Sequence, residues 1–311
     1  MRAVWLREFG GPEVLVPGDA PDPVAGPGQV LVEVAFANTT FVETQFRAGA
    51  PGPFRAAPPL IPGNGVGGVI SAVGEGVDPG LAGQRVVTST GGSGGYAQRV
   101  AVDAAAVFAV PPSLELDAAV AVLADGRTAT GLVHATRVRP GDRVLVEAAA
   151  GGVGGLLVQL AKAAGAFVIG AAGGPAKVAR VQAADAVVDY LLPDWASSLG
   201  EIDVVFDGVG GSIGAAAFGR LRRGGRMAAY GLASGAWAEV SEEDAASRGI
   251  TVVRSIGGAE EMRAFTESAL AEAAAGRLVP VIGQRFPLEK AADAHAAIES
   301  RTTVGKTLLV A

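Results

Sequence analysis

The sequence predicts an α/β protein that combines a doubly wound parallel sheet with a second, β-rich part. Three observations carry this prediction. A glycine-rich turn lies between an apolar strand and a helix, strands and helices alternate after residue 144, and short strands cut by Gly and Pro precede residue 118. Because the chain has 311 residues, we expect more than one hydrophobic core.

The glycine-rich turn lies in the segment 144–165, which reads VLVEAAAGGVGGLLVQLAKAAG. The first three residues are apolar enough for a buried parallel strand, and leucines and alanines after Gly154 recur at helical spacing. Small residues let the backbone turn sharply and let a pyrophosphate approach, and the helix N-terminus offers free N–H groups. This context predicts a dinucleotide site rather than an ordinary tight turn.

Strand and helix candidates alternate along the rest of the chain. Further strands of the parallel sheet are expected at 166–172, 186–189, 203–207, 226–231 and 250–254, with a helix at 175–184. After residue 258 we expect a helix at 260–275, a strand at 279–284, a helix at 288–300 and a final strand at 306–310. Six parallel strands make the sheet doubly wound, and we expect the tail to return to the N-terminal part.

The N-terminal part is predicted to be a small β-barrel or sandwich-like unit. Strands are expected at 1–9, 30–36, 67–73, 85–88 and 96–102. The segment 51–62 contains five prolines and is predicted to be a loop. Residues 117–137 have a helical period, with a break expected near Gly126.

Composition and charge exclude several classes of protein. The formal net charge of −6 and the pI near 5.1 argue against a nucleic-acid surface. No stretch is long and apolar enough to span a bilayer, and the N-terminus lacks the apolar core of a signal peptide, so we expect a cytoplasmic location. The chain has no cysteine and only two histidines, His134 and His295, which we interpret as structural because both lie in helical, Ala-rich stretches.

Several motifs together resemble one known family. The glycine-rich turn, the segment DVVFDGVGG at 203–211, the Gly-Gly-Arg turn at 224–226 and the tail ESRTTVGKTLLV resemble the zinc-independent quinone oxidoreductase (zeta-crystallin-like) branch of the medium-chain dehydrogenase/reductases. This resemblance implies a GroES-like substrate domain at 1–120, completed by 258–311, and a Rossmann domain at 121–257. It also implies NADPH as the hydride donor, a small-molecule acceptor, and a homodimer joined through the last Rossmann strand.

The residues that would bind zinc are missing. Asn64 stands where the alcohol dehydrogenases of this superfamily place a His ligand, and Gly65 stands where they have Glu. A tetrahedral thiolate site cannot form without cysteine, so polarisation of a carbonyl by zinc is not expected. We therefore expect no metal, as in the zinc-independent branch.

The second strand of the parallel sheet predicts NADPH rather than NADH. It ends in Gly170-Ala171-Ala172 with no acidic residue for a ribose 2′-hydroxyl, and Lys177 and Arg180 follow. The resemblance places the 2′-phosphate at Lys177 and Tyr190, although such cations also commonly face solvent. It further assigns the cofactor to the turn residues Gly151, Gly152, Val153 and Gly154, to Thr128 beside the nicotinamide, and to the loop residues Gly231, Leu232 and Ser234.

The residues around the acceptor depart from the family pattern. Thr40 and Glu43 align with the Asn and Asp of the family's Asn-Phe-x-Asp motif, and Gln45 and Pro51 stand where relatives have tyrosines. A tyrosine acid is thus missing there, and the proton would come from water. Thr40, Glu43, Tyr96 and Thr128 remain candidate pocket residues, with simpler alternatives. Glu43 could hold Arg47, Tyr96 could fill the barrel core, and Thr128 could bond within its helix.

Three functions remain open at this point. The first is hydride transfer from NADPH to a quinone, and the second is reduction of an α,β-unsaturated carbonyl such as an alkenal, an enone or an enoyl thioester. The third is NADPH binding without turnover. The acidic charge disfavours a thioester reductase, which would need a basic patch for its carrier phosphate. The sequence does not name the acceptor or fix the oligomeric state.

Overall fold

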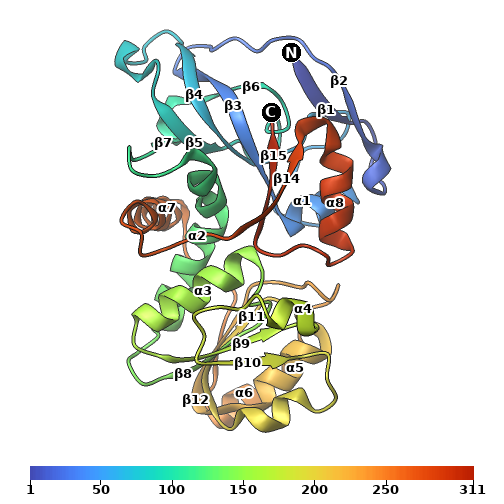
Figure 1. The fold of residues 1–311 in the computed structure, drawn as a ribbon, viewed down its shortest axis with the longest axis vertical. Coiled ribbons are helices and arrows are strands. Elements are labelled where there is room, and N and C mark those ends of the chain that lie inside the picture. Colours follow the sequence, from blue (N-terminus) through green and yellow to red (C-terminus); the bar gives the residue numbers. More distant parts are fainter. The chain divides into compact units, whose positions relative to one another are not determined.

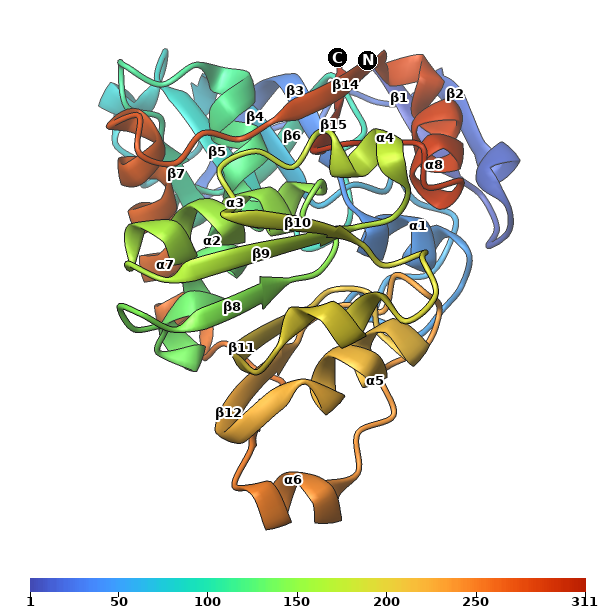
Figure 2. The same ribbon diagram turned by 60° about the horizontal axis from the view of Figure 1, so that its bottom comes forward.

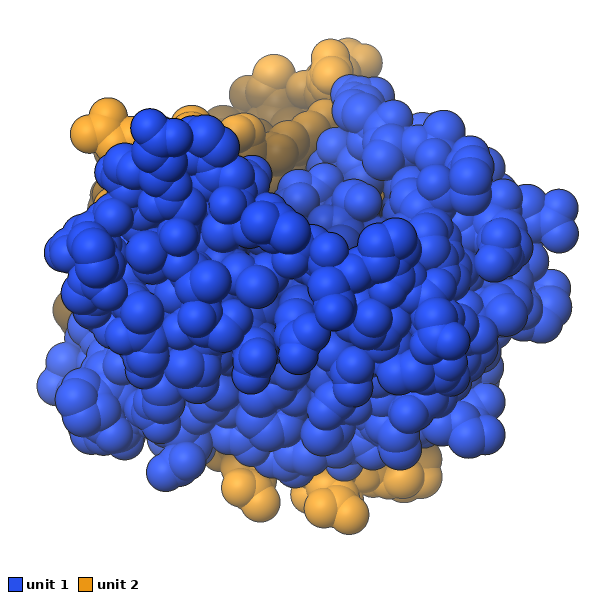
Figure 3. All heavy atoms as spheres, turned by 90° about the horizontal axis from the view of Figure 1, so that it is seen from above, with its two compact units in different colours: residues 1–124, 270–311 blue, residues 125–269 orange.

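The computed structural model describes residues 1–311 and divides them into two compact units. Unit 1 contains Met1–Ala124 and Leu270–Ala311, and unit 2 contains Asp125–Ala269 (Figure 3). The domain boundaries near 120 and 258 remain a prediction, because compactness alone does not define a functional domain. Each unit has its own sheet and its own hydrophobic cluster.

Unit 2 contains the six-stranded parallel sheet that the sequence predicts. Its strands lie in the order β10 (Ala186–Asp189), β9 (Phe167–Ala172), β8 (Arg143–Val146), β11 (Ile202–Asp207), β12 (Leu221–Ala229) and β13 (Thr251–Val253). All five pairings are parallel. The doubly wound Rossmann-like fold is confirmed.

Helices cover both faces of this sheet. α3 (Gly152–Ala163) contacts β8 and β9, whereas α5 (Gly211–Gly219) contacts β11 and β12, and α6 (Glu242–Arg248) contacts β12. Figures 1 and 2 show α3 on one side of the strands and α5 with α6 on the other. Right-handed crossovers require this arrangement, because the strand order proceeds in opposite directions from β8 and from β11. The boundary between β8 and β11 is the switch point at which such sheets bind ligands.

Two helix predictions are wrong in detail. The helix α2 (Leu116–Thr136) runs through Gly126 without a break. A glycine inside a helix costs about 1 kcal/mol, and the buried neighbours Leu123 and Ala129 offset that cost. The helix predicted at 175–184 ends early, since α4 covers only Pro175–Val178. Val181 instead packs against Gly170 in β9, which draws the chain out of the helix.

Unit 1 contains the β-rich part and the tail of the chain. The main path of its sheet runs β14 (Ile282–Pro287), β15 (Lys306–Val310), β3 (Gln29–Thr39), β4 (Gly65–Val73), β5 (Arg85–Ser89) and β7 (Val107–Ala109), and β6 (Arg99–Asp103) pairs with β3. β1 (Arg2–Leu6) and β2 (Leu15–Asp19) form a separate antiparallel pair. The strands expected at 96–102 and 279–284 therefore begin three residues later. The tail enters the sheet because β15 pairs with β3.

The remaining helices complete the two units. α1 (Phe41–Arg47) and α8 (Ala291–Glu299) contact each other in unit 1, and α7 (Ala259–Ala274) spans the second boundary between the units. Five short 3-10 helices lie at Pro12–Val14, Pro79–Leu81, Ala104–Ala106, Trp195–Leu199 and Leu288–Lys290. None of the helices combines the length and the hydropathy that a membrane span requires.

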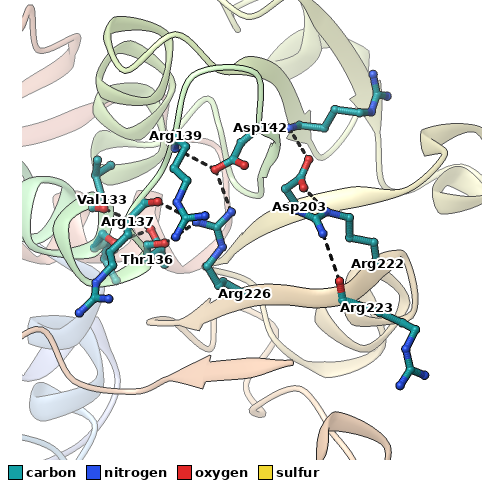
Figure 4. Close-up of polar contacts among 11 residues, drawn as sticks. Val133, Thr136, Arg137, Arg139, Asp142, Asp203, Arg222, Arg223 and Arg226 are labelled. Atoms are coloured by element: carbon teal, nitrogen blue, oxygen red, sulfur yellow. Dashed lines mark hydrogen bonds and ion pairs between the residues drawn. The ribbon is translucent and has the colours of Figure 1, made fainter. Parts of the chain in front are cut away.

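An arginine of β12 closes the C-terminal end of α2. Arg226 donates hydrogen bonds to the carbonyls of Thr136 at 2.9 Å and Arg137 at 2.7 Å, and to Oδ2 of Asp142 at 2.8 Å (Figure 4). The amide of Arg139 also donates to Asp142 Oδ2 at 2.8 Å. The last carbonyls of a helix lack partners within the helix, so this guanidinium supplies them.

Replacement of Arg226 by methionine should lower the free energy of unfolding by about 3 kcal/mol, because the Asp142 carboxylate would lose its partner in a mostly buried site. The side chains of Arg226 and Asp142 are only 15% and 9% exposed. Urea denaturation measures the loss. Arg223→Met is the control, since Arg223 is exposed on the same strand and bonds only to the Ser247 carbonyl. An equal loss in both variants would contradict the role of Arg226.

Candidate functional site

The glycine-rich turn of unit 2 is shaped for close backbone approach. Ala148 has a positive φ of 48°, and its carbonyl accepts a hydrogen bond from Gly151 N at 2.8 Å. A Cβ at Gly154 would lie 2.3 Å from the Ala148 carbonyl oxygen, so only glycine fits where α3 meets the turn. The first amides of α3 belong to Gly152, Val153 and Gly154, and such amides have no acceptor within their helix. They form an anion site of the kind that holds a pyrophosphate.

Lys177 and Tyr190 lie at the ends of the neighbouring strands of the same sheet. The ring of Tyr190, directly after β10, packs against Gly173, where a Cβ would be 2.8 Å from ring carbon Cε2. Oδ1 of Asp189 accepts a hydrogen bond from Gly174 N at 2.9 Å, which fixes the turn that leads into α4. Lys177 lies in α4 and is half-buried. A cation and a phenol thus flank a glycine turn that has no carboxylate aimed at a ribose.

Two loops at the switch point are bonded to each other. Ser234 N donates to the Val209 carbonyl at 2.8 Å, and Gly211 N donates to the Ala236 carbonyl at 3.0 Å. A Cβ at Gly231 would lie 2.5 Å from the Gly208 carbonyl oxygen, so the two loops touch through their backbones. The predicted cofactor residues Gly231, Leu232 and Ser234 all belong to the loop after β12.

A cavity of about 300 Å³ lies within unit 2 and includes Thr128 in its lining. The other lining residues come from α2, the ends of β12 and β13, and the segments that follow them: Leu132, Ala229, Tyr230, Trp237, Val253, Arg254, Ser255, Ile256, Gly257 and Met262. Arg254 forms no ion pair. The cavity therefore combines apolar walls with one cationic group.

Thr40 and Glu43 lie in unit 1, where they form a capping box at the start of α1. Oε2 of Glu43 accepts hydrogen bonds from Thr40 N at 2.7 Å and Thr40 Oγ1 at 2.9 Å, and Oε1 accepts from Asn64 N at 2.7 Å. Burial raises the pKa of Glu43. The interpretation that Glu43 holds Arg47 is wrong, because Arg47 instead pairs with Glu299 and donates to the Gly10 carbonyl at 2.6 Å.

Tyr96 is fully buried in the hydrophobic cluster of unit 1. Its hydroxyl lies 2.9 Å from Nε2 of His295 and 3.4 Å from Oγ1 of Thr39. Burial, aided by the charge of Arg47, lowers the pKa of His295 to about 3. Tyr96 is therefore a core side chain, which is the simpler of the two alternatives.

The side chains that are present do not fit a catalytic zinc site. The chain has no cysteine, and the two histidines do not cluster with acidic residues into a possible metal site. The backbone amide of Asn64 donates a hydrogen bond to Glu43, and Gly65 lies in β4 and has no side chain that could bind a metal. His295 is bonded to Tyr96, and the ring of His134 lies against Phe265. A zinc ion in a protein needs three or four such donors at one place.

Comparison with known proteins identifies the family. Residues 26–112 match the family described as alcohol dehydrogenase GroES-like domain, and residues 182–309 match the one described as zinc-binding dehydrogenase. Human quinone oxidoreductase is 33% identical over an alignment that covers 100% of this chain and 98% of that protein. The chain belongs to the quinone oxidoreductase branch of the medium-chain dehydrogenase/reductases. This membership makes it an oxidoreductase with a GroES-like and a Rossmann-like part.

Further proteins are similar to this chain over nearly its whole length. A Burkholderia 2-haloacrylate reductase is 32% identical, and the alignment covers 99% of this chain and 98% of that enzyme. The Escherichia coli quinone oxidoreductase structure, complexed with NADPH, has a TM-score of 0.90 at 28% identity with complete coverage of both chains. The Thermus thermophilus quinone oxidoreductase, also solved as a complex with NADPH, has a TM-score of 0.83 at 32% identity with the same coverage.

Sequence reasoning missed several residues at this site. Glu147 and Asp207 are buried side by side at the ends of β8 and β11, and Trp237 and Arg254 line the cavity. Glu147 carried a detectable signal, since an acidic residue directly between an apolar strand and a phosphate-binding turn is unexpected. Trp237 and Arg254 carried none, because nothing in the sequence places 237 and 254 beside Thr128.

Proposed function

We propose that this chain transfers hydride from NADPH to a quinone and does so without zinc. The turn at Ala148, the amides of α3 and the pair Lys177 and Tyr190 support the cofactor, because all lie at one carboxyl edge of the sheet in unit 2. The relatives solved with NADPH support the same choice. When bound, the reduced nicotinamide supplies a hydride.

The arrangement of the phosphate-binding groups is the observation that best supports NADPH as the cofactor. Gly152, Val153 and Gly154 would bind the pyrophosphate, while Lys177 and Tyr190 would hold the 2′-phosphate. Thr128 lines the cavity in which the nicotinamide and part of the acceptor would lie, and the loop at Gly231, Leu232 and Ser234 would border it. These side chains bind and orient, and the apolar walls exclude water.

The absence of a side chain that is positioned to donate a proton favours a quinone as the acceptor. Glu43 is committed to three hydrogen bonds at the start of α1, and Tyr96 is buried against His295, so neither is poised as an acid. A quinone that accepts a hydride becomes a hydroquinone anion, and its oxygen can take a proton from water. An alkenal or enone needs a proton at its α carbon, for which a positioned acid is an advantage.

Two observations support a second candidate, reduction of an α,β-unsaturated carboxylate. One is the resemblance to a 2-haloacrylate reductase, an enzyme named for a substrate that bears a carboxylate. The other is Arg254, whose guanidinium forms no ion pair and borders the cavity. Guanidinium groups bind carboxylates well, so this cation could hold such an acceptor.

A panel of acceptors distinguishes these functions. We expect NADPH oxidation, followed by its absorbance, to be fastest with 1,4-benzoquinone or 9,10-phenanthrenequinone and slower with trans-2-hexenal and 2-chloroacrylate. A clear preference for hexenal or 2-chloroacrylate would reverse the assignment. Binding of NADPH without oxidation by any acceptor would instead indicate a non-catalytic NADPH-binding protein. The same assays with an added chelator should show no loss of rate, because the chain lacks a zinc ligand set.

The proposal extends to a homodimer joined through β13. This strand lies at the edge of the sheet in unit 2, so its outer backbone groups have no strand partner there. Such an edge can pair with a second copy. Light scattering should give twice the mass of 30.9 kDa, and a monomeric mass would reject the dimer.

A further inference from the structure

Two carboxyl groups meet at the switch point of the unit 2 sheet. β8 and β11 are parallel neighbours with Val146 opposite Phe206, and Glu147 N donates to the Phe206 carbonyl at 3.1 Å. Glu147 and Asp207 follow this pair directly, so their side chains emerge on the same face of the sheet. The two carboxyl groups lie within hydrogen-bonding reach of each other.

These two carboxyl groups have more acceptor atoms than donors. Both residues are 0% exposed. Oδ1 of Asp207 accepts hydrogen bonds from Val209 N at 3.1 Å and Gly210 N at 2.6 Å, whereas Oδ2 of Asp207 and both oxygens of Glu147 have no donor. No lysine or arginine forms an ion pair with either group. Two adjacent ionised carboxylates in such a place would repel and leave their oxygens unsatisfied.

We propose that Glu147 and Asp207 share one proton, and that the hydrogen bond between them positions the two glycine loops of the site. Glu147 carries the proton and donates it to Oδ2 of Asp207, which stays ionised because two backbone amides bind its other oxygen. Burial, followed by the charge of Asp207, raises the pKa of Glu147 well above its ordinary value. Besides Asp207, the titratable group that faces Glu147 is Tyr230, and Asp125 and Tyr190 lie near Tyr230 in turn. None of these groups is a cation.

The shared proton links the loops that border the switch point. Glu147 directly precedes Ala148, the first residue of the glycine-rich turn, and Asp207 accepts hydrogen bonds from the amides of Val209 and Gly210 in the loop after β11. Oδ2 of Asp207 also lies against α5, where a Cβ at Gly214 would be 2.6 Å from it. Loss of the proton would place two negative charges between these loops. Glu147 is therefore a positioning residue and does not itself touch the reacting atoms.

The titration of Glu147 gives the first test. The folded chain holds a proton that the unfolded chain releases above the ordinary pKa of glutamate, so stability should fall as pH rises from there toward the raised pKa. Thermal unfolding from mildly acidic to alkaline pH should show this fall in the wild type, and Glu147→Gln should remove it because the amide donates without titrating. Glu201→Gln is the control, since Glu201 is exposed just before β11. The same pH dependence in wild type and Glu147→Gln would overturn the proposal.

Infrared spectroscopy detects the proton directly. At neutral pH the wild type should show the carbonyl band of a protonated carboxylic acid, and the difference spectrum between wild type and Glu147→Gln should contain this band. Glu43→Gln is the control, because burial also raises the pKa of Glu43, and it should leave the Glu147 band in place. A wild type without the band would overturn the proposal, whatever the variants do to stability.

NADPH binding tests the positioning role, and this arm rests on the proposed function. Glu147→Gln should keep the NADPH dissociation constant within about twofold, whereas Glu147→Ala should raise it about tenfold, because the Oδ2 acceptor loses its only donor. Equal weakening in both variants would reject the role of the donor. If the wild type binds no NADPH at all, the proposed function fails, while the stability and infrared tests still decide the shared proton.

Discussion

Replacement of Lys177 by alanine is expected to weaken NADPH binding about tenfold to a hundredfold and to change NADH binding by no more than about twofold. A charged hydrogen bond to a phosphate contributes about 1.5 to 3 kcal/mol, and each 1.4 kcal/mol is about tenfold in affinity. NADH lacks the 2′-phosphate, so it loses nothing when the ammonium group is removed. Fluorescence titration of both reduced cofactors measures the two dissociation constants.

The matched control for this prediction is Arg180→Ala. Arg180 lies three residues later and is exposed, and it tests whether any nearby cation attracts the phosphate. We expect a smaller loss of NADPH affinity, and one that added salt removes, because an exposed charge acts mainly over distance. Equal loss of NADPH and NADH in Lys177→Ala would show that Lys177 supports the fold of the turn and does not read the phosphate.

Acid is expected to destabilise unit 1 through His295. The pKa of this histidine is about 3 in the folded chain, against an ordinary value of 6.5, because the imidazole is buried. As pH falls below 6.5, the unfolded chain binds a proton that the folded chain cannot accept. Stability should therefore fall by about 1.4 kcal/mol per pH unit between these two pKa values, or about 4 kcal/mol in all by pH 3.

The variant His295→Gln isolates this contribution from the carboxylates that titrate in the same range. Glutamine can keep a hydrogen bond to the Tyr96 hydroxyl but does not titrate, so its urea denaturation midpoint should depend less on acid than that of the wild type. His134→Gln is the matched control, because it makes the same substitution at an exposed position, and the reduced acid dependence should be specific to His295→Gln. Identical acid dependence in His295→Gln and the wild type would show that His295 is not the group concerned.

The unit 2 fold was predictable because its signals are local. The short run at 186–189, with two adjacent valines, and the glycine-rich turn at 148–154 are each specified within a few neighbours, and the strand at 186–189 has the predicted bounds. Gly126 was misread because the packing that stabilises α2 comes from distant residues. The early end of α4 depends on Val181 meeting Gly170, which no local pattern encodes.

The site was predictable only where a motif fixes it. Membership of the family, the glycine-rich turn and the missing zinc ligands can all be read from residue types along the chain. The hydrogen-bond partner of Glu43 could not be predicted in this way. Helical spacing favoured Arg47, whereas in the folded chain the backbone amide of Asn64 donates to Glu43. The pairing of Glu147 with Asp207 depends on the order of β8 and β11 in the sheet, which spacing along the chain does not reveal.

The place of β15 determines the order in which the chain can fold during synthesis. β15 pairs with the Phe36–Thr39 part of β3, so the sheet of unit 1 stays incomplete until residues 306–310 have left the ribosome. Unit 2 is one continuous stretch and can fold as soon as residue 269 has emerged. A nascent chain at that stage carries a folded unit 2 and an N-terminal sheet in which the edge of β3 is still open, so this edge is a site for chaperone capture until β15 has emerged.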